Sequence, residues 1–162
     1  MLNRLMKQLV DLVYGVNKVK NKFLLEHPDE QVLATDGAKG IATGNNEDIT
    51  RGLPWVASQR AVILLSNKRI VCGKWMIPLD QIEEAQLLQI SSLLESGQVL
   101  KIGLKDGRHF QFGMQVNPEW TRQEALPLIL EEGQLKYSAF SIGIRLFVLG
   151  YFLYWMYERF LR

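Results

Sequence analysis

The chain has 162 residues, of which 48% are hydrophobic and 22% are charged. This length suits one globular domain with accessory segments, and the composition excludes an intrinsically disordered chain. The 13 glycines and 5 prolines exclude collagen-like and proline-rich structures, and the single cysteine excludes an internal disulfide. We therefore expect one modest hydrophobic core and a reducing compartment.

The net charge of +2 is unevenly distributed along the chain. Residues 1–26 carry five Lys or Arg against two acids, residues 27–136 carry eleven against fourteen, and residues 137–162 carry three against one. A nucleic-acid-binding domain needs a basic globular surface, so the distribution argues against nucleic acid as a partner. Basic ends instead suit contact with something anionic.

Residues 1–27 are predicted to form a basic amphipathic helix. Apolar residues recur at spacings of three and four and therefore fall on one side of a helix; they are Leu2, Leu5, Met6, Leu9, Leu12, Val13, Val16, Val19 and Phe23. The other side carries Arg4, Lys7, Asp11, Lys18 and Lys22. The segment lacks the apolar h-region and cleavage site of a secretory signal peptide.

Two roles stay open for this helix. It either lies in a lipid headgroup layer or packs against its own domain or another subunit. In either case, the residues predicted to contact the membrane or a partner are Leu5, Leu9, Leu12, Lys18 and Lys22.

Residues 28–135 are predicted to form a β-rich domain. Strand-like patterns cover Gln31–Asp36, Arg60–Leu65, Lys74–Leu79, Val99–Lys105 and Arg108–Met114, and Ile70-Val71 adds a short strand. The dipeptide Asp106-Gly107 predicts a tight hairpin turn with positive backbone dihedrals between the last two long strands.

A helix is predicted to follow this hairpin. Asn117 can cap it and Pro118 suits its first turn. Its apolar face would consist of Trp120, Ala125, Leu128 and Ile129. Pro127 lacks a backbone amide, so we expect a kink or a second short helix near it.

Short motifs in the same region resemble bacterial pleckstrin-homology-like and GRAM-type domains. They are the opening phrase Asp29–Ala34, the central phrase Ala61–Val71, and Trp75–Ile82 followed by a Lys-Asp-Gly-Arg hairpin. The resemblance covers roughly two thirds of the chain. It implies a seven-stranded, barrel-like sandwich capped by a C-terminal helix, used to bind lipid headgroups or proteins and often joined to membrane segments.

The chain departs from the lipid-binding version of that pattern. Phosphoinositide-binding members usually place several basic residues in the first hairpin, whereas residues 36–50 offer Lys39 alone beside three acids. This departure argues against specific phosphoinositide binding. A second basic cluster could contact an anion or headgroup, although ordinary solvated turn charge also explains it; its members are Arg60, Lys68, Arg69 and Lys74.

Residues 136–162 are predicted to form one transmembrane helix and a short tail. The twenty residues 138–157 contain a single charge, Arg145, and as a helix they would span about the 30 Å of a bilayer's hydrocarbon. Ala139, Gly143 and Gly150 leave gaps for a neighbouring helix, and Arg145 needs a compensating partner. The alternative is a buried hydrophobic helix of a soluble oligomer.

Catalytic motifs are missing from the sequence. His27 and His109 stand far apart, without Cys or carboxylates at metal-ligand spacing. The glycine-rich residues 37–44 lack the Walker arrangement and are expected to form a flexible turn. Cys72 is expected to be a small buried or half-buried residue. We therefore expect no metal, no cofactor and no enzymatic activity.

The sequence thus predicts a mainly β (α+β) fold with an N-terminal amphipathic helix and one C-terminal transmembrane helix. Its function would be that of a non-catalytic, membrane-anchored binding module. The leading version is an accessory or assembly subunit of a larger membrane protein complex, and the alternative is a peripheral lipid-sensing or lipid-binding protein acting alone. Because no export signal is present, the domain is expected on the cytoplasmic or equivalent side of the membrane.

Overall fold

The computed structural model describes residues 2–45, 49–51, 55, 58–91, 96–133, 136–137 and 139–160. Within these ranges, the side chains of residues 2–6, 50–51, 91, 136–137, 139–141, 145 and 160 are not described. The described elements, in chain order, are α1 (Leu2–Tyr14), α2 (Val16–Glu26), β1 (Val32–Thr43), β2 (Thr50–Arg51), β3 (Gln59–Ser66), β4 (Arg69–Cys72), β5 (Trp75–Pro78), a 3-10 turn (Leu79–Gln81), β6 (Ile82–Ser91), β7 (Ser96–Leu104), β8 (His109–Met114), α4 (Glu119–Arg122), β9 (Ile129–Gly133), β10 (Lys136–Tyr137) and α5 (Ala139–Phe160).

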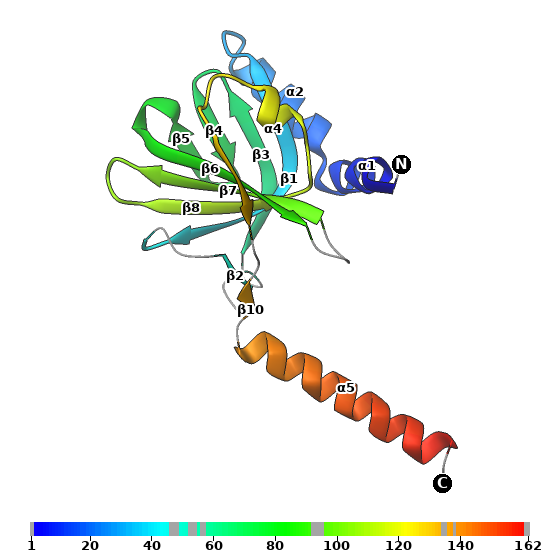
Figure 1. The fold of residues 1–162 in the computed structure, drawn as a ribbon. Helices are drawn as coiled ribbons and strands as arrows, with labels where there is room; N and C mark the ends of the chain where they lie inside the picture. The colour runs from blue at the N-terminus through cyan, green and yellow to red at the C-terminus, as the bar shows by residue number, and fades with distance from the viewer. Residues whose placement is uncertain are drawn as a thin grey trace.

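The predicted mainly β fold is confirmed. Eight strands form one sheet in the order β5-β4-β3-β1-β8-β7-β6-β9, and the sheet is strongly curved (Figure 1). All neighbours are antiparallel except β6 and β9, which are parallel. The long strand β1 joins the two halves of the sheet, because Ala38, Lys39 and Gly40 pair with both β3 and β8.

The concave face of the sheet encloses the main core. Alternating residues of β7 and β8 contribute Leu100, Ile102, Phe110 and Phe112, as their sequence pattern predicts. Residues 37–43 were expected to form a flexible turn, and that prediction is wrong, because they continue β1. A Cβ on Gly40 would lie 2.5 Å from the Trp75 ring, so the glycine lets β1 pass close to that ring.

The hairpin between β7 and β8 is confirmed at its predicted position. Only Gly107 of the predicted Asp106-Gly107 pair has a positive φ, at 84°. Asp106 holds the turn with its side chain instead, because Oδ1 accepts a hydrogen bond from the Arg108 amide at 3.1 Å.

The N-terminal segment is helical, but it forms two helices rather than one. Gly15 adopts a left-handed conformation with φ of 65° and ends the first helix. Its amide bonds to the carbonyl of Leu12 at 3.1 Å, which closes the last turn of α1. The apolar pattern continues across this break, so the periodicity alone did not predict it.

The helix predicted after the hairpin forms as a single turn only, and the kinked continuation or second short helix expected near Pro127 does not form. Asn117 does cap a helical turn, because its Oδ1 accepts a hydrogen bond from the Glu119 amide at 3.0 Å, but α4 contains only 4 residues. The Gln123 side chain then bonds to the backbone of Leu126, and Pro127 follows. The predicted helical residue Ile129 instead begins β9, which pairs with β6. The turn still delivers Trp120 into the core, where it is fully buried.

Candidate functional site

A buried carboxylate lies where α1 meets the sheet. Asp36 of β1 has no solvent exposure, although the flanking strand residues are apolar or small. Its Oδ2 accepts hydrogen bonds from Asn117 Nδ2 at 2.6 Å and from Trp120 Nε1 at 3.3 Å. Its Oδ1 accepts one from Lys7 Nζ at 3.0 Å. Helix α1 and the α4 turn therefore both bond to one acid of β1.

Asn117 organises the surroundings of this carboxylate. The backbone amide of Asn117 donates to Gln98 Oε1 at 3.1 Å. Its side-chain Nδ2 also donates to the backbone carbonyl of Thr35 at 3.1 Å. Since the same residue caps α4, the α4 turn, β7 and β1 are tied together around Asp36. Sequence reasoning identified Asn117 only as a cap and missed its buried partners.

Among the side chains that the structure describes, Lys7 is the only basic one in contact with Asp36. Burial raises the pKa of Asp36, while hydrogen bonds from Asn117 and Lys7 oppose that rise. Burial lowers the pKa of Lys7, but its hydrogen bonds to Asp11 and Asp36 more than compensate, so the pKa of Lys7 is raised overall. Lys7 pairs with Asp11 of its own helix at 2.9 Å and with Asp36 of β1 at 3.0 Å. Its ammonium group therefore bridges α1 and the sheet.

This anchor fixes which side of α1 faces the domain. Val10 and Tyr14 lie beside Gly37, where an added Cβ would meet the Tyr14 ring at 2.7 Å and Val10 at 3.0 Å. The inward side of α1 is therefore partly charged. The predicted apolar side faces outward at Leu9, Leu12 and Val13, which are 53%, 78% and 80% exposed.

Both helices of the N-terminal segment pack against the domain, α1 through the contacts with Asp36 and Gly37 described above. In α2, Val16 and Phe23 are buried against the domain, so this helix packs inward. Lys18 and Lys22 are exposed, and Lys22 lies 3.6 Å from Glu26. The side chain of Leu5 lies outside the described residues. The structure therefore brings Leu9 and Leu12 together on α1 and places the two lysines on α2.

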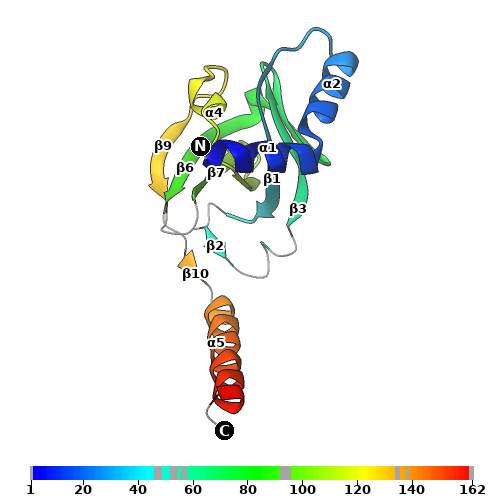
Figure 2. The same ribbon diagram turned by 90° about the vertical axis from the view of Figure 1, so that its right-hand side faces the viewer.

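The C-terminal helix α5 extends away from the sheet in both views (Figures 1 and 2). Every described side chain from Ile142 to Tyr157 is exposed, and most of them are large and apolar. A Cβ on Gly143 or Gly150 would meet nothing within 4 Å. The side chains of Ala139 and Arg145 lie outside the described residues. Within the described part of the chain, no helix meets the length and apolarity expected of a membrane span.

The second predicted cluster of basic residues does not come together on one rim. Arg60 lies near the start of β3 and Lys74 in the adjacent turn between β4 and β5. Lys68 and Arg69 lie at the opposite end of this hairpin. There Lys68 pairs with Asp29, and Arg69 pairs with the buried acid Glu30 at 2.7 Å. The latter two side chains are therefore already engaged within the domain.

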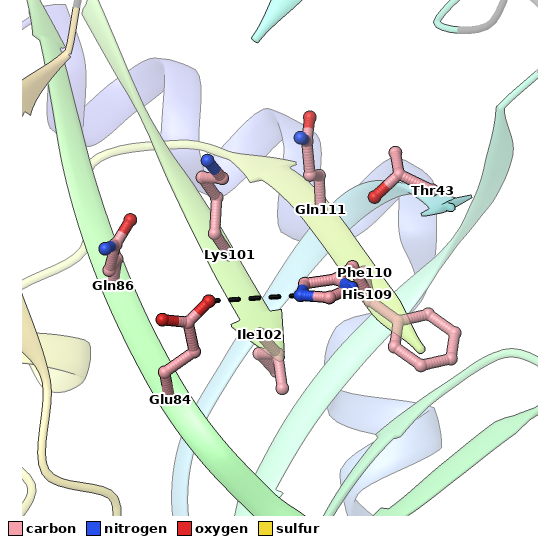
Figure 3. Close-up of a pocket in the computed structure, with 8 residues that line it drawn as sticks. All are labelled: Thr43, Glu84, Gln86, Lys101, Ile102, His109, Phe110 and Gln111. Atoms are coloured by element: carbon pink, nitrogen blue, oxygen red, sulfur yellow. Dashed lines mark ion pairs between the residues drawn. The ribbon is translucent and has the colours of Figure 1, made fainter. Parts of the chain in front are cut away.

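A small pocket is lined by residues of β1, β6, β7 and β8 (Figure 3). His109 Nε2 faces Glu84 Oε1 at 4.0 Å, and Lys101 and Gln111 extend from the neighbouring strands. Such a polar patch can bind water or a polar side chain. Thr43 also lines it, and its hydroxyl donates a hydrogen bond to the carbonyl of Asn45 at 2.9 Å.

Metal and thiol chemistry find no support in the described residues. Among them, no group of three or more His, Cys, Asp or Glu side chains could hold a metal ion. Cys72 is buried, as predicted, and burial raises the pKa of its thiol to about 12. A thiol with so high a pKa is a poor nucleophile at neutral pH.

Comparisons with known proteins assign neither a family nor a function to the chain. No protein-family model matches the chain, and the search of curated proteins also gives no match. The candidate functional surfaces are the outward face of α1 and the helix α5, because both expose large apolar side chains.

Proposed function

We propose that the protein is a non-catalytic binding module that α5 holds at a membrane. The observation that carries this proposal is the exposure of the large apolar side chains described along α5, including Phe147 at 76% and Leu146 at 63%. Soluble monomers rarely expose contiguous apolar patches of more than a few hundred Å². Lipid or another apolar helix is the partner that such a surface requires.

The C-terminal part of α5 supports a membrane location. Tyr154, Trp155 and Tyr157 are exposed there and precede Glu158 and Arg159. Aromatic rings followed by charges are typical of the boundary between hydrocarbon and water. The domain would then lie on one side of the membrane with α5 as its attachment.

We further propose that the domain is a pleckstrin-homology-like module. In support, seven antiparallel strands from β5 to β6 form a curved sheet, and the α4 turn inserts Trp120 into the core. The chain differs from the expected pattern because its closing helix is a single turn followed by β9. A fold of this kind supports binding rather than a particular chemistry.

The role of an accessory or assembly subunit has better support than that of an independent lipid sensor. Gly143 and Gly150 leave open positions on one side of α5, where another helix can approach closely. In contrast, Lys68 and Arg69 are paired with acids and are poorly placed to receive a headgroup.

The test is size analysis of the full chain after mild detergent extraction from its native membrane. A subunit should migrate in a stoichiometric complex larger than the chain alone. Gly143→Ile together with Gly150→Ile fills the open positions and should release the chain from the complex. The matched control is Val148→Ile, which adds one methylene on the opposite side of α5 and should leave the complex intact. Migration of the unmodified chain as a monomer would favour the lipid sensor.

A further inference from the structure

We propose that α1 is a second membrane contact, whose outward face of Leu9, Leu12 and Val13 lies on the surface of an anionic bilayer. This inference goes beyond attachment through α5, because it concerns a different helix and fixes how the domain faces the lipid. Its starting point is the inverted packing of α1, with charge toward the protein and leucines toward solvent.

The orientation of α1 is set by contacts that leave little freedom to rotate. Lys7 reaches the buried Asp36 at 3.0 Å, and Tyr14 and Val10 lie against the bare backbone of Gly37. Rotating the helix to bury its leucines would leave Asp36 buried without a countercharge, which is strongly unfavourable. The helix α1 lies on the outside of the domain (Figure 2), and its Leu9, Leu12 and Val13 side chains are exposed.

The size of this face favours a lipid surface over a second copy of the chain. Three partly exposed side chains offer at most a few hundred Å², whereas a stable protein interface buries about 800 Å² per partner. A helix at a bilayer interface needs only a narrow apolar stripe that enters the headgroup boundary by about 5–10 Å.

The charge of the N-terminal segment favours anionic lipid. Residues 1–26 contain five basic residues and two acids. Both acids pair with lysines of their own helices, Asp11 with Lys7 and Glu26 with Lys22, and Lys7 is shared with Asp36. The exposed Lys18 on α2 forms no ion pair with any described residue, so its charge adds to the attraction of this segment for an anionic surface.

The experiment places an environment-sensitive fluorophore on the full chain through Val13→Cys. The native Cys72 is buried with a high pKa, so the introduced thiol should react selectively. Vesicles of phosphatidylcholine are compared with vesicles that also contain phosphatidylglycerol. A probe attached through Asn17→Cys, at an exposed polar position of α2, serves as the matched control.

We expect the probe at position 13 to shift to shorter wavelength and to be quenched by spin-labelled lipid in the anionic vesicles. The shift should be much weaker in phosphatidylcholine alone and weak at position 17 in both. Adding Leu9→Ser and Leu12→Ser should abolish it, since each replacement weakens partitioning about tenfold or more.

Three outcomes would overturn the inference. If the chain floats with the vesicles while the probe at position 13 stays in water, α1 does not touch lipid and attachment through α5 stands. If the chain floats with neither kind of vesicle, both proposals fail. If a blue shift grows with protein concentration in the absence of vesicles, the occupant of this face is a second copy.

Discussion

The ammonium group of Lys7 lies 3.0 Å from Oδ1 of Asp36, a carboxylate without solvent exposure in the middle of β1. The two residues are 29 positions apart in the chain, and their contact ties α1 to the sheet. An amphipathic helix ordinarily buries its apolar side, but a buried acid that needs a countercharge reverses this preference here. The apolar side of α1 therefore remains available to a partner.

Replacing Lys7 should destabilise the domain more than its surface position suggests. Breaking a fully buried ion pair costs about 3–5 kcal/mol, and we expect about 2 kcal/mol for Lys7→Met because Lys7 is partly exposed. Adding Asp36→Asn should restore much of the loss, because no uncompensated charge then remains. Urea unfolding measures both values, and Lys22→Met, which breaks an exposed pair, is the control with little expected effect. Equal stability of Lys7→Met and Lys22→Met would show that the buried pair is unimportant.

The pH dependence of stability should reflect Asp36. Burial raises its pKa above the ordinary value of 3.8, so the folded state holds the proton more tightly than the unfolded state does. Its contribution is complete below pH 3.8 and is lost as the pH rises through the folded-state pKa. Lys7→Met removes an opposing interaction and should steepen this loss, whereas Asp36→Asn should abolish it. Unfolding free energies measured across this range would contradict the assignment if all three proteins gave parallel curves.

The decrease in the free energy of unfolding at alkaline pH should reflect the titration of Lys7. Its pKa is raised above 10.5, so its contribution is complete below that pH and is lost as the pH rises through the folded-state pKa. Asp36→Asn removes part of the cause and should reduce this loss. Unfolding measured above pH 10.5 in both proteins tests the expectation, and an identical alkaline slope would oppose it.

Gly37 should control the docking of α1. In Gly37→Ala the new methyl overlaps the Tyr14 ring, so α1 must move, at a cost of about 1–3 kcal/mol. Amide hydrogen exchange should then rise in α1 while β7 and β8 stay protected. Gly44→Ala is the matched control, because its Cβ would meet nothing within 4 Å. Unchanged exchange in α1 of Gly37→Ala would show that the helix is not held at this point.

Cys72 should resist thiol reagents while the domain is folded. It is fully buried and its thiol has a pKa of about 12, so little thiolate exists at neutral pH. Labelling should become rapid in denaturant. Rapid labelling of the native chain at neutral pH would mean that β4 opens readily.

Most of the β-rich fold could be predicted from alternation and turn residues. The β7–β8 hairpin is the clearest case, since Gly107 stands where the chain needs a positive φ. The strand β6 was missed because its alternation is incomplete: Ala85 and Leu87 are buried, but the next buried residue is Ile90. The helix expected after Asn117 was wrong because Gln123 and Pro127 end it after one turn.

The candidate site could be predicted only in part. Periodicity identified the stripe that contains Leu9 and Leu12, but it did not indicate which side of α1 meets the domain. That orientation depends on Asp36 and Asn117, which are distant in sequence and become neighbours only in the folded chain. The available indication was a single acid, Asp36, inside a strand-like pattern, and nothing else in the sequence marked it as buried.

Alkaline carbonate extraction tests attachment through α5 most directly. The full chain should remain in the membrane pellet, and a variant with Leu146→Lys and Leu149→Lys should be released because two charges then interrupt the apolar surface. The matched control carries Leu25→Lys and Leu130→Lys, two exposed leucines outside α5 (83% and 60%, against 63% and 54% for Leu146 and Leu149), and should stay in the pellet. Release of the unmodified chain by carbonate would contradict the proposal that α5 holds the protein in the membrane.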